Sequence, residues 1–351
     1  MGINKYISFS NDNPFGTQAK MLYHVDRINE YNKNNDTFPI FMEINLTDIC
    51  NMKCVWCITE NRKNFTLDYN LLKQFLSDFK ENGGKAVTYS GGGEPTTYKY
   101  FLELLEFTHN LGLEIGLMTN GNYKPEYNKT ISKYCKWARF SLDTVNEENY
   151  FNWKKSRAVP TVVNNIKLLN KTNTKVGVNC NVNNNMTIIE IQEFINTVKN
   201  DCSYIQFRPI IPRYFNEEKT ILNDDVWLYL NTLNEKNINL SNDKFKDLLG
   251  ENEPFPFNSC EGHFFSPILD ANGDFKVCMY HPNDNRFTFG NINTDNFLNI
   301  WNSQRRQEVI NFLRNDINYC DECQICCKLY ELNKLIDFIK YPNIDLDVNF
   351  L

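Results

Sequence analysis

The sequence predicts an α/β fold, with a partial barrel of six strand–helix units followed by a small cysteine-rich α+β domain. Short apolar or β-branched segments, each bounded by turn residues, alternate with segments in which apolar residues recur at helical spacing. This alternation favours a parallel sheet, open or curled into a partial barrel. After about residue 240 it gives way to short strands and loops rich in Cys, Asn and Asp. We therefore expect a helical extension over residues 1–38, a barrel over 39–240, a cysteine-rich domain over 255–330 and a terminal helix and tail over 331–351.

The individual elements follow from the same patterns. The six predicted strands are Pro39–Leu46, Lys85–Ser90, Leu113–Thr119, Trp137–Leu142, Val176–Val182 and Tyr204–Pro209. The first helix is expected to have Thr66 as N-cap, to end at Gly83-Gly84, and to present one apolar face at Leu71, Leu72, Phe75, Leu76 and Phe79. Further helices are predicted in Phe101–Leu111, Pro160–Leu169, Ile188–Val198 and Asp224–Leu233. Outside the barrel, one helix is expected around Met21, Val25, Ile28 and Tyr31, and another over Leu329–Lys340.

Composition and charge exclude several classes of protein. The 351 residues are 42% hydrophobic, enough for a substantial core, and the formal net charge of −6 disfavours nucleic acid and anionic membranes as partners. No apolar run reaches the length of about 18 residues that a membrane helix requires. Met1–Asn13 lacks the apolar segment of a secretory signal. Twelve cysteines without such a signal are more often metal ligands than disulfides, so we expect a cytoplasmic protein.

Three cysteines, Cys50, Cys54 and Cys57, follow the first predicted strand with the spacing CxxxCxxC. A structural zinc site normally has four ligands, and no fourth Cys or His lies nearby in the sequence. Three ligands on a four-iron cluster leave one iron open for another molecule. A zinc knuckle and buried structural cysteines are the alternatives.

This motif, with the aromatic Trp56 just before its last cysteine, resembles that of the radical S-adenosylmethionine (SAM) superfamily. The resemblance implies a [4Fe–4S] cluster whose open iron binds the amino and carboxylate groups of SAM. It also implies that one electron from the cluster cleaves SAM, and that a 5′-deoxyadenosyl radical abstracts hydrogen from a substrate. Trp56 would then lie near the cluster or the adenine, unless it is a core aromatic residue.

Other motifs lie at the ends of later strands, where parallel α/β folds bind ligands. Gly91, Gly92, Gly93 and Glu94 follow the second strand and resemble the family's GGE(P) motif, whose backbone binds the SAM amino group; the alternative is a plain turn.

The resemblance also implies that Asn120, Ser141 and Asp143, after the third and fourth strands, touch SAM. An ordinary turn residue is the alternative for Asn120. Arg208, in the sixth strand, is a candidate for holding a carboxylate through a bidentate fork, or else a surface residue.

The C-terminal cysteines form a second set. Cys260 and Cys278 are spaced as C-x12-G-x4-C, and a tight run of four cysteines ends the region. With the segment Phe289-Gly290-Asn291-Ile292 before Trp301, they resemble the SPASM/twitch domain of many radical SAM enzymes. This implies an auxiliary [4Fe–4S] cluster on Cys260, Cys278, Cys320 and Cys323, with Cys326 or Cys327 as alternative ligands. A zinc site is the other interpretation.

Cys135, Cys180 and Cys202 fit neither set, and small buried apolar residues are the expectation for all three. Cys180 has a second interpretation. If its strand face points into the barrel, its thiol could return a hydrogen atom to a substrate radical, as in radical SAM epimerases.

We therefore expect a radical SAM enzyme that dehydrogenates or epimerises a small polar substrate, such as a sugar, cyclitol or nucleotide sugar, with help from the auxiliary cluster. Flavodoxin or ferredoxin would be the reducing partner. The alternatives are a maturase that modifies a ribosomal peptide or protein side chain, and a non-catalytic iron–sulfur scaffold.

Overall fold

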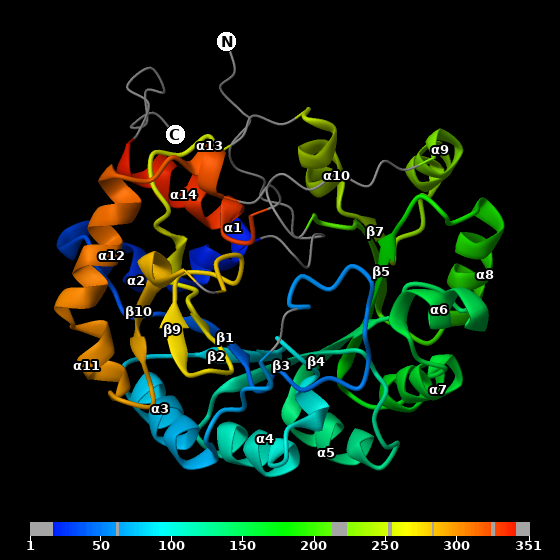
Figure 1. Ribbon diagram of the computed structural model, residues 1–351, viewed down its shortest axis with the longest axis horizontal. Coiled ribbons are helices and arrows are strands. Elements are labelled where there is room, and N and C mark those ends of the chain that lie inside the picture. The colour runs from blue at the N-terminus through cyan, green and yellow to red at the C-terminus, as the bar shows by residue number, and fades with distance from the viewer. Residues whose placement is uncertain are drawn as a thin grey trace.

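The computed structural model describes residues 17–60, 63–212, 223–251, 255–282, 284–323 and 327–341, and its described strands form one curved ten-stranded sheet (Figure 1). The strand order is β10-β9-β8-β1-β2-β3-β4-β5-β6-β7. The strands are β1 (Phe41–Asn45), β2 (Ala86–Ser90), β3 (Glu114–Thr119), β4 (Cys135–Ser141), β5 (Lys175–Val182), β6 (Tyr204–Pro209), β7 (Ile238–Leu240), β8 (Ile268–Leu269), β9 (Asp274–Lys276) and β10 (Thr288–Asn291). All pairs from β8–β1 to β6–β7 are parallel, which confirms the predicted parallel sheet.

Helices surround the outer side of this curve (Figure 1). Those following the barrel strands are α3 (Tyr69–Glu81), α4 (Phe101–Asn110), α5 (Tyr127–Tyr134), α6 (Glu147–Lys154), α7 (Val159–Asn170), α8 (Ile188–Val198), α9 (Asp224–Thr232) and α10 (Asn242–Leu249). The terminal regions add α1 (Thr17–Met21), α2 (Val25–Asn34), α11 (Phe297–Trp301), α12 (Gln304–Asn315), α13 (Tyr319–Glu322) and α14 (Tyr330–Lys340). Among the described residues, no helix is long and apolar enough to cross a membrane.

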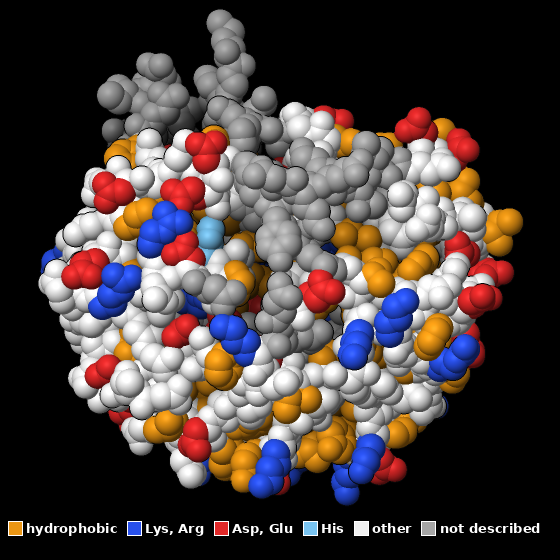
Figure 2. All heavy atoms as spheres, viewed as in Figure 1, with side chains coloured by type: hydrophobic (Ala, Val, Ile, Leu, Met, Phe, Trp, Pro, Cys, Tyr) orange, Lys and Arg blue, Asp and Glu red, His pale blue; other side chains and the backbone are white. Residues whose placement is uncertain are grey.

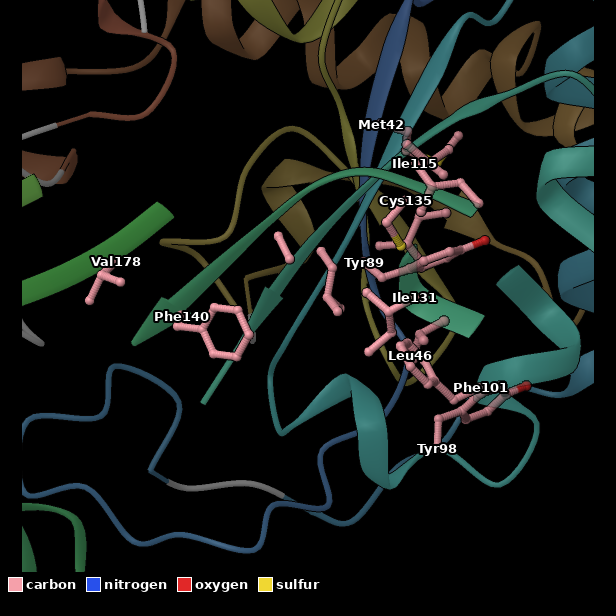
Figure 3. Close-up of a cluster of buried hydrophobic side chains, with 14 of the residues drawn as sticks. Met42, Leu46, Tyr89, Tyr98, Phe101, Ile115, Ile131, Cys135, Phe140 and Val178 are labelled. Carbon is pink, nitrogen blue, oxygen red and sulfur yellow. The ribbon is translucent and has the colours of Figure 1, made fainter. Parts of the chain in front are cut away.

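The two faces of the barrel sheet have opposite character. One face carries apolar residues such as Met42, Tyr89, Ile115, Phe140 and Val178, which pack with the outer helices in the main core (Figure 3). The register places polar residues on the other face, since paired residues of neighbouring strands share a face. These are Glu43, Asn45, Thr88, Ser90, Arg139, Ser141, Asn179, Asn181, Gln206 and Arg208. We call the space on this side the lumen.

Two aromatic side chains share the lumen face near the beginnings of the strands. A Cβ atom added at Gly116 would lie 2.2 Å from the Trp137 ring, and one at Gly177 would lie 2.2 Å from the Tyr204 ring. The two glycines therefore leave room for Trp137 and Tyr204 to cover the sheet at that level.

The C-terminal region extends the barrel sheet instead of packing as a separate layer. β8 pairs with β1 in parallel, and β9 and β10 continue in antiparallel pairs. Glu43 and Ile44 of β1 therefore face Ile268 and Leu269 across the ladder.

Three local predictions were wrong. Helix α3 is capped by Asp68, whose carboxylate accepts the backbone N–H groups of Asn70 and Leu71, because Thr66 is used in a bond to Thr47. Leu71 is 40% exposed and lies off the buried face. The N-terminal helix is broken into α1, a 3-10 turn (Leu22–His24) and α2, with Val25 exposed.

Candidate active site

The loop that carries Cys50, Cys54 and Cys57 crosses the inner side of the curve directly after β1 (Figure 1). The C-terminal end of α6 supports it, because the N–H of Lys53 donates to the Lys154 carbonyl at 3.0 Å. The three cysteines are half-buried. Burial raises the pKa of the Cys54 thiol, and nearby charges at Cys57 and Cys50 raise it further, so the three sulfurs lie close enough to interact.

The glycine motif packs against this loop. The N–H of Gly93 donates to the Thr47 carbonyl at 2.7 Å, and the N–H of Glu94 donates to the Ile49 carbonyl at 2.9 Å. A Cβ atom at Gly93 would lie 2.1 Å from the carbonyl oxygen of Ile49. Position 93 therefore accepts glycine alone without movement of the cysteine loop.

Glu94 is 2% exposed and joins the motif to the end of β3. Its carboxylate accepts the Thr119 hydroxyl at 2.6 Å, the Asn120 N–H at 2.7 Å, and both the N–H and hydroxyl of Thr96. Burial raises the pKa of Glu94, while these hydrogen bonds oppose the shift. Because protein donors surround both carboxylate oxygens, the arrangement suits positioning of the loop better than direct contact with SAM.

Asn120 reaches the cysteine loop itself. Its side-chain N–H donates to Oδ1 of Asn51 at 2.7 Å and lies 3.9 Å from Sγ of Cys50. The structure thus brings the cysteine loop, the glycine motif and Asn120 together at the carboxyl ends of β1, β2 and β3.

A buried ion pair lies beside the same loop. Lys154 and Asp143 are in direct contact, with side chains 4% and 0% exposed, and Asp143 also accepts the Asn181 N–H at 2.8 Å. The Lys154 ammonium lies 5.7 Å from the ring centre of Trp56, which itself packs against Trp153. Burial lowers the pKa of Lys154, but the Asp143 carboxylate, together with the nearby Cys54 and Tyr150 groups, raises it above its ordinary value, so Lys154 stays charged. Lys154 was not predicted from the sequence as a site residue. Asp143, for which contact with SAM was expected, is paired with Lys154.

Ser141, Arg208 and Arg139 lie on the lumen face of the sheet, and Arg139 was not singled out from the sequence. Nη2 of Arg139 is 3.0 Å from Sδ of Met118. Across the lumen, Glu43 of β1 pairs with Lys328, which follows Cys327.

Cys180 lies on the opposite, helix-covered face of β5, and this is a correction to the hydrogen-donor interpretation. It is 0% exposed, pairs in register with Phe207, and its thiol donates to the Asp143 carbonyl at 3.2 Å. The side chain therefore packs in the core, as do those of Cys135 and Cys202.

Four of the C-terminal cysteines line one hollow, namely Cys260, Cys278, Cys323 and Cys327. Burial raises the pKa of the Cys260 thiol, and charges at Cys327, Cys278 and Cys323 raise it further. Cys320 is exposed and does not line the hollow, so Cys327 takes the place expected for it. Cys326, the other alternative, lies outside the described residues.

The surroundings of this hollow fit an iron–sulfur cluster. Its remaining lining is largely apolar or aromatic and includes Phe257, Val277, Phe287 and Leu313. Four thiolates in such a site match the ligand number of a four-iron cluster. Within the described ranges, no three His, Cys, Asp or Glu side chains, the cysteines of this hollow included, form a group that could hold a metal ion in their present positions.

Comparisons with known proteins agree with this geometry. A model of the radical SAM superfamily matches residues 44–198, and a model of the SPASM iron–sulfur cluster-binding domain matches residues 260–327. The chain is 25% identical over 319 residues to a cysteine-type anaerobic sulfatase-maturating enzyme of Clostridium novyi, with 79% of this chain and 82% of that protein covered. It is 28% identical over 215 residues to a GTP 3′,8-cyclase of Clostridium perfringens, with 54% of this chain covered; the match spans 66% of the cyclase.

Solved structures show the same fold. SuiB of Streptococcus suis, bound to SAM, has a TM-score of 0.66 at 19% identity and covers 88% of this chain and 75% of its own. The enzyme anSMEcpe with bound SAM has a TM-score of 0.60 at 17% identity and covers 84% of this chain and 88% of its own. The two family models together span more than half of the sequence. The chain belongs to the radical SAM superfamily and carries a C-terminal SPASM iron–sulfur cluster-binding domain, a membership that implies SAM and two [4Fe–4S] clusters.

Proposed function

We propose that this enzyme cleaves SAM reductively at Cys50, Cys54 and Cys57 and removes a hydrogen atom from a polar substrate in the lumen. The observation that carries the proposal is the set of hydrogen bonds that joins the cysteine loop, the glycine motif and Asn120. The cluster, when bound, supplies the electron that cleaves SAM into methionine and a 5′-deoxyadenosyl radical.

The chain's own residues hold and orient these groups. The three cysteines would ligate the cluster, and the backbone of Gly91, Gly92 and Gly93 would receive the SAM amino group. Asn120 and Ser141 would contact the rest of SAM from the ends of their strands. Trp56 and the Asp143–Lys154 pair fix the far side of the loop, which keeps the cysteines in one arrangement.

For the substrate we favour a small polar metabolite, such as a sugar, cyclitol or nucleotide sugar. The lumen supports this choice because its wall combines amide, hydroxyl and guanidinium groups on neighbouring strands. Dehydrogenation is favoured over epimerisation, since Cys180 lies behind the sheet and is no hydrogen donor to the lumen.

A peptide or protein substrate is the second candidate. SuiB, a structural relative, has also been solved with its precursor peptide SuiA, and the sulfatase-maturating relative aligns over most of this chain. Under this alternative the same radical chemistry would modify a side chain of the peptide.

The auxiliary site would accept an electron in an oxidation. Once a hydrogen atom has left the substrate carbon, loss of one proton and one electron completes a dehydrogenation. The Lys328–Glu43 pair joins the residue after Cys327 to the lumen wall, so an ion pair links the edge of the four-cysteine hollow to the proposed substrate space. Flavodoxin or ferredoxin would supply the first electron, in the reducing environment of the cytoplasm.

Iron and sulfide analysis with EPR, on anaerobically reconstituted protein, tests the proposal. We expect about eight irons per chain and formation of 5′-deoxyadenosine after reduction by dithionite with SAM. Replacing Cys50, Cys54 and Cys57 together by Ala should abolish this product and leave the auxiliary cluster. Absence of both iron and 5′-deoxyadenosine in the wild-type protein would contradict the proposal and favour a non-catalytic role.

A further inference from the structure

Two arginines, Arg139 and Arg208, occupy the lumen wall. Arg139 of β4 and Arg208 of β6 lie on the same face of the sheet, with β5 between them. Within the described part of the chain, neither forms an ion pair with a carboxylate. The contact recorded for the Arg139 side chain, at 3.0 Å, is with the Met118 thioether, which is a weak acceptor.

The two positive charges influence each other. Partial burial lowers the pKa of Arg139 to about 10, and the nearby charge of Arg208 contributes to that shift. The register places Arg139 opposite Gly177 and Arg208 opposite Asn181, four residues further along β5, and the two positive charges repel one another unless an anion lies between them. The carboxylate on this wall, Glu43, attracts Arg139 from a distance, but its own direct contacts are with Lys328 and with a hydrogen bond from Ser90.

Amide groups beside the arginines have unused acceptors. Oδ1 of Asn179 and Oε1 of Gln206 are buried and have no hydrogen-bond partner among the described residues. Their residues pair with each other across β5 and β6, on the same face as the arginines. Buried acceptors of this kind are costly unless a donor reaches them. A ligand that pairs with both the arginines and these amide oxygens therefore carries an anionic group together with hydroxyl or N–H donors.

We propose that Arg139 and Arg208 bind an oxyanion of the substrate, a carboxylate or a phosphate, while Asn179 and Gln206 accept hydrogen bonds from its donors. This inference rests on the proposed function and specifies its substrate class. Guanidinium groups suit either anion because their planar N–H pairs match two oxygens at once. The aromatic rings of Trp137 and Tyr204 lie on the same wall nearer the beginnings of the strands.

Calorimetric titration of the reconstituted protein, without reductant, tests this site. Inorganic pyrophosphate represents phosphates, and succinate represents carboxylates. The variants are Arg139→Gln, Arg208→Gln and, as a control, Arg305→Gln, whose side chain is 45% exposed on α12. A charged hydrogen bond contributes about 1.5–3 kcal/mol, so either lumen variant should raise the Kd of the preferred anion by roughly ten- to a hundredfold. Arg305→Gln should leave that Kd unchanged.

Several results would overturn the inference. These are failure of the wild type to bind either anion, equal binding by all variants, and loss of SAM affinity in the lumen variants with anion binding intact. The last result would assign the arginines to SAM. If a Gln variant does not fold, Arg139→Lys and Arg208→Lys keep the charge and remove the fork, and they should still weaken binding. Because the titration needs no radical chemistry, 5′-deoxyadenosine formation independently shows whether the proposed function has failed.

Discussion

Replacing Lys154 by Met tests whether the buried ion pair holds the cysteine loop in place. Met keeps most of the apolar stem but leaves the Asp143 carboxylate, which is 0% exposed, without its counter-charge. Breaking a buried pair from one side costs about 3–5 kcal/mol. Asp143 retains the hydrogen bond from the Asn181 N–H, while the contact of Lys154 with Trp56 is lost at a cost of about 1 kcal/mol. Because the retained hydrogen bond favours the lower end of the first range, we expect the two losses together to lower the free energy of unfolding by about 4 kcal/mol.

Urea unfolding of the reconstituted protein, followed by tryptophan fluorescence, measures this loss as a shift of the midpoint at constant slope. The neighbouring Lys155→Met is a matched control, because Lys155 is exposed and the substitution keeps a side chain at the same positive φ of 54°. The control should change stability by no more than about 0.5 kcal/mol. The double variant Asp143→Asn with Lys154→Met removes both charges and should recover most of the loss. If Lys154→Met is as stable as the control, or if the double variant is no better than the single one, the reasoning is refuted.

Three further predictions concern the loops and the second site. Gly93→Ala should weaken SAM binding by roughly ten- to a hundredfold, as overpacking of about 1–3 kcal/mol implies, because the new methyl group meets a carbonyl of the cysteine loop; equilibrium dialysis with SAM measures this, and unchanged affinity would contradict it. Cys327→Ala should lower the iron content by about four atoms per chain, whereas Cys320→Ala should not, and the opposite pattern would restore the sequence-based ligand set. Burial lowers the pKa of His263 to about 3. Because His263 binds a proton on unfolding in acid, the free energy of unfolding should fall by about 2 kcal/mol between about pH 7.5 and about pH 5. Urea titrations at the two pH values should show that His263→Phe removes this part of the pH dependence.

The strand–helix alternation was sufficient to predict the parallel sheet and the positions of its first six strands, because those signals are local. The contribution of β8 was not predictable in the same way. Two residues, Ile268 and Leu269, pair with a strand more than two hundred residues earlier, and no periodicity in the sequence records such a contact. Helix α6 was missed because few of its residues are apolar, although its end holds Lys154 beneath the cysteine loop.

The candidate site, too, was predictable from the sequence only in part. The spacing CxxxCxxC and the glycine run identified the loops that meet at the strand ends, since chemistry constrains those residues directly. The alternation in β5 did not show which of its two faces points into the lumen. The structure places Asn179 and Asn181 on the lumen side and Cys180 in the core. Likewise, the resemblance favoured Cys320 over Cys327 as a ligand, whereas the structure places Cys327 in the lining of the hollow and leaves Cys320 exposed.

The central position of β1 has a consequence for how the chain is made. Among the described strands β1 leaves the ribosome first, yet one of its edges is paired only by Ile268 and Leu269 of β8. Until those residues emerge, the backbone groups on that edge of β1 have no strand partner, and exposed strand edges of this kind invite pairing with other chains. We therefore expect truncation between the barrel and the SPASM region to leave an unpaired, aggregation-prone edge on β1.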